Sequence, residues 1–499
     1  MKFAALIVLA VVFLIELAKA QYVIHQGMLR HADGSVTELS DAIGGVVAPS
    51  ETISQIVDHF SDDNNSTFTQ RYFVNETQWN RDDINAPVLL CVGGEGPPLD
   101  KTVLSNSVHC NDLVDYSIQK KSLTFALEHR FYGSSMPAED YSTGNLKAYL
   151  STEQAVQDIG EFILQMKIKY NIPEETPWIT FGGSYPGMVA AIARQVLPNQ
   201  VFAAVSSSAP LLASVAMPGY NEIVGVAYKT KSVGGSEQCF NIIQNGHNTI
   251  GEMLKDSSGR RQLERDFNTC GGEGSLEDEM NQAVFANMGV VYFPAQSNDP
   301  ACTTPLCNIG SVCEYLADDA SAGNSAYTSL VHLSSKMSSA CKFVSHRAEI
   351  AASIPSSSPS RVWLYQTCSE WGYYMTCENS KCPFVQNLPS LQLSLDICKR
   401  AFDIDADAVS SNIAKANERY GGNQFPADRV MFINGEVDPW RANSVQESPT
   451  GSTSEPVHFT PGSSHHYWTH PDAPTDTEEI IEARQAIFKQ LDEWLVRLR

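Results

Sequence analysis

The residues best suited to covalent chemistry lie in one short segment, residues 182–187, with the sequence Gly-Gly-Ser-Tyr-Pro-Gly. The segment follows an apolar run at 178–181 and precedes a stretch with a helical pattern. A serine at a sharp strand-to-helix turn presents its hydroxyl above a sheet, as a hydrolase nucleophile must. Pro186 stands where the G-x-S-x-G pattern has glycine, but proline is acceptable in the first turn of a helix. The segment predicts that Ser184 is a nucleophile; the alternative is an ordinary glycine-rich turn.

A serine becomes a nucleophile at neutral pH only with a base and an acid that orients this base. In hydrolases with such a turn, the partners follow in the order serine, acid, histidine. Asp438 comes shortly after the strand-like run 430–434, and His465 comes shortly after the run 457–460. Both side chains are therefore expected at the edge of the sheet where Ser184 lies. This order predicts a Ser184, Asp438, His465 triad.

Each partner has a competing interpretation. His466 is a neighbouring candidate for the base, and Glu436 is a weaker candidate for the acid. Asp438 could instead cap a turn before Pro439, and His465 could be an ordinary loop histidine. The joint order and the positions after strands favour the triad over these separate roles.

An acyl-transfer site also needs donors for the oxyanion. The backbone N–H of Tyr185, the residue after the serine, is the first expected donor. The second is expected from the turn 93–96 (Gly-Gly-Glu-Gly), with the N–H of Gly94 or Glu95 as candidates. The alternative is that this segment is only a glycine turn.

Strand-like and helical patterns alternate in the first half of the chain and must position these residues. Such alternation is typical of a mostly parallel sheet with helices on both faces, and so predicts an α/β fold. The strand-like runs are 88–92, 122–128, 178–181 and 201–205, and the helical patterns are 152–170 and 188–197.

The middle of the chain is predicted to be mainly helical, with patterns at 239–254 and 326–350 and a Ser/Pro-rich linker at 353–360. Strand character returns at 362–365 and 430–434, and the chain ends in a helix at 478–498. We therefore expect a sheet domain formed by 21–213 and 356–499, interrupted by a helical insertion at 214–355.

The first twenty residues have the features of a signal peptide: Lys2, an apolar run at 3–15, and a small-x-small cleavage signature at 18–20 before Gln21. The 13-residue run is too short for a membrane anchor, which needs about 20 apolar residues. The mature protein is expected to enter the secretory pathway, and the sequence leaves open whether it is lysosomal or secreted and whether it forms a homodimer.

In an oxidising compartment, the 12 cysteines are expected to form disulfides rather than metal sites, because their spacings fit no zinc template. A bridge between Cys91 and Cys110 is the one local pairing we expect. No metal or cofactor is expected. The glycosylation sequons are Asn64, Asn65 and Asn75.

The net charge of −23, from 57 acidic and 34 basic side chains, argues against a nucleic-acid partner, which requires a basic surface. Acidity of this size fits a protein of acidic vesicles or of the extracellular space, since fewer carboxylates are charged at low pH.

In combination, motifs along nearly the whole mature chain resemble those of the prolyl carboxypeptidase family of serine peptidases. The stretch 365–384 is most similar to the thymus-specific branch of that family. The segments that carry the resemblance are 58–60 (DHF), 67–72 (TFTQRY), 93–96 (GGEG), 128–133 (EHRFYG), 182–187, 365–370 (YQTCSE), 434–440 (NGEVDPW) and 464–466 (SHH).

The resemblance implies an α/β-hydrolase fold with an inserted helical cap, and it implies Ser184, Asp438 and His465 as the triad. Family members usually have glycine where this chain has Pro186, which leaves the serine intact but could alter the floor of the pocket.

The resemblance further implies a peptide substrate cleaved after proline near a chain end, with Trp440 against the proline ring. Trp440 could equally be a core residue. Glu370 and Glu95 are candidates to pair with a terminal amine, or they are structural acids. The thymus-specific likeness makes strict proline preference doubtful. A carboxylesterase or lipase, or a non-catalytic binding protein, could share the scaffold.

Overall fold

The structure is a computed structural model that describes residues 28–30, 36–38, 48–83, 85–345, 353–449 and 456–497. The predicted signal peptide, residues 1–20, lies outside these ranges. Within the described ranges, no helix is both long and apolar enough to cross a membrane.

An eight-stranded mixed sheet forms the centre of the molecule, in the order β12-β11-β8-β7-β5-β6-β4-β3. The strands from β12 to β6 are parallel, whereas β3 and β4 pair antiparallel at one edge. The bounds are β3 Ser50–Ile56, β4 Thr67–Asn75, β5 Val88–Val92, β6 Leu123–Leu127, β7 Trp178–Gly183, β8 Ala203–Ser207, β11 Val430–Gly435 and β12 Val457–Thr460.

The central strands are buried on both faces, which explains their continuous apolar sequences. In β5, Leu89 and Cys91 belong to one core cluster, shared with α2 (Asn111–Lys120) and α16 (Glu478–Val496). The alternating residue Leu90 belongs to the other cluster, shared with α4 (Thr152–Tyr170) and α5 (Tyr185–Val196). Helices therefore cover both faces, and this arrangement is an α/β-hydrolase fold, as expected.

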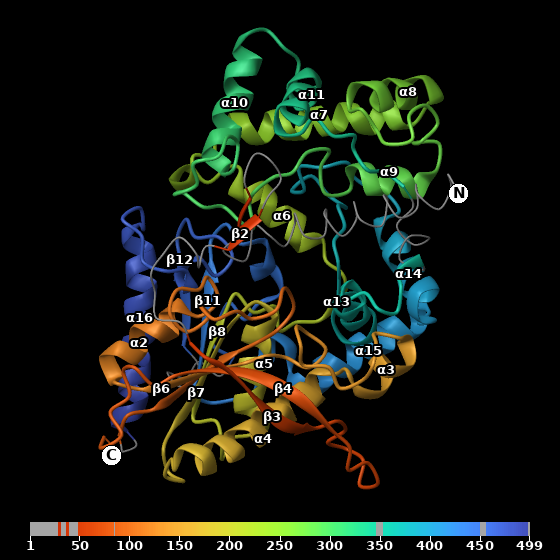
Figure 1. Cartoon of the computed structure of the whole chain (residues 1–499). Helices are drawn as coiled ribbons and strands as arrows, with labels where there is room; N and C mark the ends of the chain where they lie inside the picture. The colour runs from red at the N-terminus through yellow and green to blue at the C-terminus, as the bar shows by residue number, and fades with distance from the viewer. Residues whose placement is uncertain are drawn as a thin grey trace.

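Between the short strands β9 (Ser214–Ala216) and β10 (Gly372–Tyr374) the chain is mainly helical, and β9 and β10 pair in parallel. Figure 1 shows α7 to α11 gathered at the end of the molecule away from β3 and β4. The helices of this segment are α6 Pro218–Ala227, α7 Glu237–Leu254, α8 Ser257–Asp266, α9 Glu279–Ala286, α10 Ile309–Ser321, α11 Ala326–Met337 and α13 Ser360–Gln366. The remaining helices are α3 Thr143–Tyr149, α14 Ser390–Phe402 and α15 Ala406–Tyr420.

Two expectations about local structure were wrong. Residues 362–365 are helical, within α13, because a run of four apolar residues fits a buried helix turn as well as a strand. The helix expected over 326–350 ends at Met337, where Ser338 adopts an extended backbone with φ −154°. The chain then leads to the Cys270–Cys341 disulfide.

All 12 cysteines form disulfides, and the expected Cys91–Cys110 bridge is confirmed. The other bridges are Cys239–Cys313, Cys270–Cys341, Cys302–Cys307, Cys368–Cys398 and Cys377–Cys382. The described residues contain no cluster of side chains that could hold a metal ion.

Of the three sequon asparagines, Asn65 is exposed and Asn64 and Asn75 are half-buried. Nδ2 of Asn75 donates a hydrogen bond to the Leu104 carbonyl, 3.0 Å away. Asn65 therefore presents the most accessible amide of the three.

A buried ion pair joins the antiparallel edge of the sheet to α4. Nε of Arg130 donates to Oδ2 of Asp158 at 2.7 Å, and its Nη1 donates to the Val57 carbonyl at 2.9 Å. His59 Nε2 lies 2.8 Å from Oδ1 of the same aspartate. The motifs 58–60 and 128–133 therefore meet in one network at Asp158, where they connect the edge of the sheet to α4.

Removing the charge of Asp158 should destabilise the protein, because Arg130 would remain buried without its partner. We expect Asp158→Asn to lower the free energy of unfolding by about 3–5 kcal/mol. Equilibrium unfolding in urea measures the change. Asp403→Asn, which breaks the exposed Lys399–Asp403 pair, is the matched control and should leave the unfolding midpoint unchanged. Equal effects of the two variants would contradict the prediction.

Candidate active site

Ser184 lies at the tip of the turn between β7 and α5, in a strained backbone conformation. Its φ is 62° and its ψ −133°, and its N–H donates to the Ser207 carbonyl at 2.8 Å. The turn is so tight that a Cβ atom on Gly182 would lie 2.3 Å from the Pro186 carbonyl oxygen. Glycine is therefore required at position 182, and the serine hydroxyl is lifted clear of the sheet.

Asp438 and His465 are in contact at the carboxyl ends of β11 and β12. His465 Nδ1 lies 3.0 Å from both carboxylate oxygens of Asp438, and both residues are buried. Oδ1 of Asp438 also accepts the Trp440 backbone N–H at 2.9 Å. A carboxylate held in this way can orient an imidazole so that its Nε2 faces a nucleophile.

The two rival residues have other partners. Oε2 of Glu436 accepts the Gly462 N–H at 2.8 Å, so this carboxylate holds the loop after β12. The ring of His466 packs against Gly183, where an added Cβ would meet it at 2.9 Å, and its Nδ1 lies 3.1 Å from Thr469 Oγ1. Of the two adjacent histidines, His465 is the one that contacts Asp438.

Ser184 and His465 line the same cavity, which has a volume of about 1770 Å³ and lies between the sheet and the helical segment. Glu95 and Tyr185 lie beside Ser184 in its wall, and Trp440 lies beside His465. The helical segment contributes apolar residues including Val291, Phe293 and Phe285. The cavity is therefore built from residues on both sides of the β9–β10 pair.

Aromatic rings surround the histidine side of the cavity. The centroid of Trp440 lies 5.4 Å from that of Tyr220 and 5.4 Å from that of Tyr373, and both pairs are edge-to-face. The Trp440 ring is 6.2 Å from that of His465, and its buried Nε1 has no hydrogen-bond partner among the described residues. The structure therefore brings Trp440 to the cavity.

Glu95 points toward Ser184. Burial raises the pKa of its carboxyl to about 8, while hydrogen bonds from the Ser184 hydroxyl and the Tyr185 N–H act in the opposite direction. A carboxyl near the Tyr185 N–H lies where an oxyanion would be held. The two oxyanion candidates Tyr185 and Glu95 are thus neighbours in the structure.

Pro186 packs against Gly94 of the glycine turn. A Cβ atom on Gly94 would lie 2.3 Å from Pro186 Cγ and 2.6 Å from its Cδ. Pro186 therefore occupies space that is available only because residue 94 is a glycine and has no Cβ atom. The sequence marks Gly94 as an oxyanion candidate and Pro186 as a departure from the G-x-S-x-G pattern, but it does not predict that the two residues are in contact.

A polar network beneath the cavity anchors Tyr185. Its hydroxyl accepts a hydrogen bond from Gln366 Nε2 at 2.8 Å and lies 3.1 Å from Thr152 Oγ1 and 3.0 Å from His129 Nε2. Because the Tyr185 ring is buried and held at its far end, its backbone N–H is fixed in direction. Sequence analysis did not identify this network, although Gln366, His129 and Tyr185 each lie in a motif that carries the family resemblance.

Glu370 belongs to this network and does not line the cavity. Its carboxylate accepts the Thr152 N–H at 3.0 Å and the Thr152 hydroxyl at 3.0 Å, at the first turn of α4. Burial raises the pKa of Glu370 to about 7. The structure therefore does not bring Glu370 to the place where a substrate amine would meet it.

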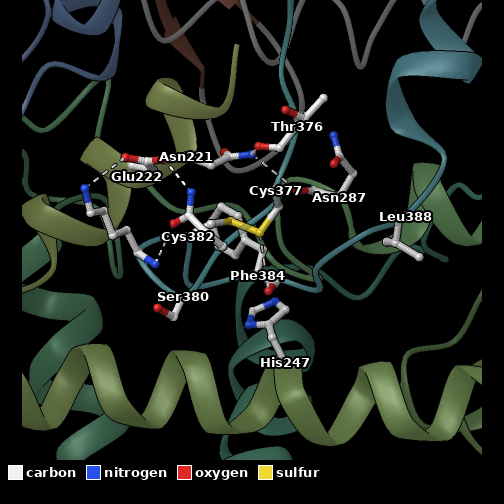
Figure 2. Close-up of a disulfide and its surroundings, with 12 residues drawn as sticks. Asn221, Glu222, His247, Asn287, Thr376, Cys377, Ser380, Cys382, Phe384 and Leu388 are labelled. Carbon is white, nitrogen blue, oxygen red and sulfur yellow. Dashed lines mark hydrogen bonds and ion pairs between the residues drawn. A yellow bond between two sulfur atoms is a disulfide. The ribbon is translucent and has the colours of Figure 1, made fainter. Parts of the chain in front are cut away.

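The disulfide loop after β10 forms part of the cavity wall. Asn221 of α6 donates to the Thr376 carbonyl at 2.9 Å, and Asn287 donates to the Met375 carbonyl at 2.9 Å. Figure 2 shows the Cys377–Cys382 bridge between these contacts and α7. Because Met375 lines the cavity, these bonds fix one of its walls.

The helical segment also holds the histidine loop. The His465 N–H donates to the Gln296 carbonyl at 3.1 Å, and the Ser464 hydroxyl donates to the Asn298 carbonyl at 2.8 Å. The Tyr467 hydroxyl donates to Asp299 at 3.0 Å. The position of the histidine therefore depends on a loop that is distant in sequence.

Comparisons with known proteins identify relatives over most of the chain. A family model described as serine carboxypeptidase S28 matches residues 55–487. The thymus-specific serine protease of Homo sapiens is 34% identical over 458 residues, covering 89% of this chain and 86% of the relative. The lysosomal Pro-X carboxypeptidase of Bos taurus is 25% identical over 474 residues, covering 90% of this chain and 89% of the relative.

Among solved structures, the proline iminopeptidase of Mycobacterium smegmatis aligns with 90% of this chain and 100% of its own, at 12% identity and a TM-score of 0.38.

The Gly94–Pro186 contact predicts a specific double-mutant result. We expect Gly94→Ala to reduce kcat/KM by about 100-fold, since displacement of the turn beside Ser184 by about 1 Å is enough for such a loss. Pro186→Ala removes the atoms that would clash, so the double variant should recover most of the activity. Kinetics of all four proteins, with thermal midpoints as the folding control, test the coupling. Additive losses would contradict it.

The buried carboxyl of Glu370 predicts a pH-dependent stability difference. Its folded pKa of about 7 lies above the usual 4.5, so the wild type loses stability as pH rises through this window. Glu370→Gln does not titrate. We expect the variant's free energy of unfolding to rise relative to wild type between pH 4.5 and 7, by about 3 kcal/mol, and the difference to level off above pH 7. Urea titrations at several pH values measure this difference, and a constant difference would contradict the assignment.

Proposed function

Since the chain belongs to the serine carboxypeptidase S28 family of serine peptidases, we propose that it is an exopeptidase that cleaves near a chain terminus and prefers proline next to the scissile bond. Ser184 is the nucleophile, His465 the general base and Asp438 the residue that orients it. The observation that carries this assignment is the contact of Asp438 with His465 in the wall of the cavity that Ser184 also lines.

The reaction follows the acyl-transfer scheme. Ser184 Oγ attacks the scissile carbonyl carbon while His465 Nε2 takes the hydroxyl proton, and the Tyr185 N–H stabilises the oxyanion. His465 then gives the proton to the leaving amine as the C–N bond breaks. A water molecule, deprotonated by His465, hydrolyses the ester and releases Ser184.

The aromatic wall supports the preference for proline. The rings of Trp440, Tyr220 and Tyr373 meet at edge-to-face angles beside His465, which leaves ring faces and edges against which a rigid pyrrolidine can pack. Relatives named Pro-X carboxypeptidase agree with this preference, whereas the thymus-specific relatives are named only as serine proteases.

We further propose that residues 214–355 form a cap over an α/β-hydrolase domain of residues 21–213 and 356–499. The loop at 296–299, which hydrogen bonds to the histidine loop, supports a cap that completes the site. Relatives named lysosomal support a location in lysosomes or outside the cell.

Loss of the triad should abolish turnover without unfolding the protein. We expect a fluorophosphonate probe to label the wild type but not Ser184→Ala, and kcat to fall by about 10⁶-fold in that variant. Asp438→Asn should lower kcat by about 10⁴-fold, because the imidazole loses its orienting acid. Burst kinetics and probe labelling measure both effects. A wild-type protein that the probe does not label would refute the serine-hydrolase mechanism.

The substrate class is tested by steady-state kinetics of the wild-type protein. Matched peptides with and without proline beside the scissile bond should differ in kcat/KM, with the proline peptide preferred. Turnover of short-chain esters with no cleavage of any peptide would favour a carboxylesterase or lipase instead.

A further inference from the structure

One cationic side chain in the cavity takes no part in the proposed mechanism. Among the described residues that line the cavity, Lys342 is the only lysine or arginine, and it comes from the helical side. It follows Cys341, well beyond the end of α11. Glu95, beside Ser184, is the only carboxylate among the same lining residues. The cavity therefore has a carboxyl group beside Ser184 and an amino group in its helical wall.

The backbone of Lys342 is fixed. Its N–H donates to the Asn268 carbonyl at 2.8 Å, and its carbonyl accepts the Cys270 N–H at 2.8 Å, in a parallel bridge with Thr269. The disulfide between Cys270 and Cys341 closes the same junction. Little backbone entropy remains to be lost when Lys342 binds a ligand.

No described carboxylate forms an ion pair with Lys342, whereas the Phe285 ring lies 5.6 Å from Nζ. His247 of α7, seen below the disulfide loop in Figure 2, is also close enough for the charge of Lys342 to lower its pKa. The ring of His247 has no free site, since Nδ1 lies 2.7 Å from the Ile243 carbonyl and Nε2 accepts the Val290 N–H at 3.0 Å.

This environment favours an anionic ligand. Burial lowers the pKa of Lys342 to about 7. Burial also lowers the pKa of His247 to about 4, and the charge of the nearby Lys342 contributes to this shift. Lys342 is half-buried and has no carboxylate partner among the described residues. A charge held partly away from water is costly, and the cost falls when a ligand supplies the opposite charge. The one anion that every unmodified peptide carries, whatever its side chains, is its terminal carboxylate.

We propose that Lys342 binds a carboxylate of the peptide substrate, and that this contact selects peptides that enter the cavity with their carboxyl end toward the helical wall. The proposal rests on the peptidase function proposed above. It specifies a carboxypeptidase mode, in which Ser184 attacks the bond near the end that Lys342 holds. The same chemistry could come from an acidic side chain, and the experiment separates the two sources.

The test compares kcat/KM for peptide pairs in the full-length protein. The first pair differs only at the C-terminus, free acid against amide; the second is amidated and differs by one internal Glu or Gln. We expect the wild type to prefer the carboxylate member of the first pair by about tenfold to 100-fold, the range for a hydrogen bond to a charged group. Lys342→Met should abolish this preference, and Lys342→Arg should retain it.

Lys336→Met is the matched control, because Lys336 is exposed on α11 and does not line the cavity. It should behave as wild type. A preference found only in the second pair, and lost in Lys342→Met, would support carboxylate binding with a side chain as the source. A wild type without preference in either pair, or a preference that survives Lys342→Met, would overturn the proposal.

A binding measurement separates this proposal from the proposed function. Peptide acids and their amides are added during labelling of Ser184 by the fluorophosphonate probe, so no peptide cleavage is needed. In one outcome, peptides are not cleaved, but peptide acids slow the labelling of the wild type more than their amides do, and this difference is lost in Lys342→Met. The peptidase function then fails while the carboxylate site stands. If peptides are cleaved but acids and amides slow labelling equally in wild type, the site fails alone.

Discussion

The left-handed backbone of Ser184 is the constraint around which the rest of the site is arranged. A non-glycine residue with φ 62° is expected to cost about 1–3 kcal/mol, and it persists only where the surroundings fix it. Here the Ser184 N–H is tied to Ser207 of the neighbouring strand, and the approach of Gly182 to Pro186 leaves no room for a side chain. The continuous apolar strands beneath, buried on both faces, supply the rigidity that holds this strained turn.

The same constraint explains why so much buried polarity lies under Tyr185. In the proposed mechanism the Tyr185 N–H stabilises the oxyanion, and such a donor acts through its direction, so Tyr185 must not rotate. The Tyr185 hydroxyl meets Thr152, His129 and Gln366, which come from three separate parts of the chain. Glu370 extends the network to the start of α4. A buried network of this kind is stabilising only when each member has a partner, which links the catalytic turn to distant segments.

The sequence predicted those parts of the site that depend on local order and failed where the role depends on contacts. Strand boundaries and the order serine, acid, histidine predicted that Ser184, Asp438 and His465 lie at one edge of the sheet, because carboxyl ends of parallel strands meet there. The structure places Asp438 against His465 and Ser184 in the wall of the same cavity. Glu370 was a candidate to pair with a substrate amine or to be a structural acid, and its position beside α4, which fits the structural role, follows from packing across 218 residues of sequence. Lys342 could not be recognised, since what distinguishes it is its place in the cavity wall without an ion-pair partner among the described residues.

The loop at 296–299 shows that the helical segment is part of the site and not merely its cover. The Gln296 carbonyl accepts the His465 N–H, and the Gln296 side chain accepts the Tyr220 hydroxyl at 2.6 Å, while Tyr220 packs against Trp440. A movement of the helical segment would therefore shift His465 and the aromatic wall together. Lys342 belongs to the same segment, so a substrate carboxylate bound there would act on the element that also holds His465. In the proposed mechanism, substrate recognition and positioning of the base thus share one structural support.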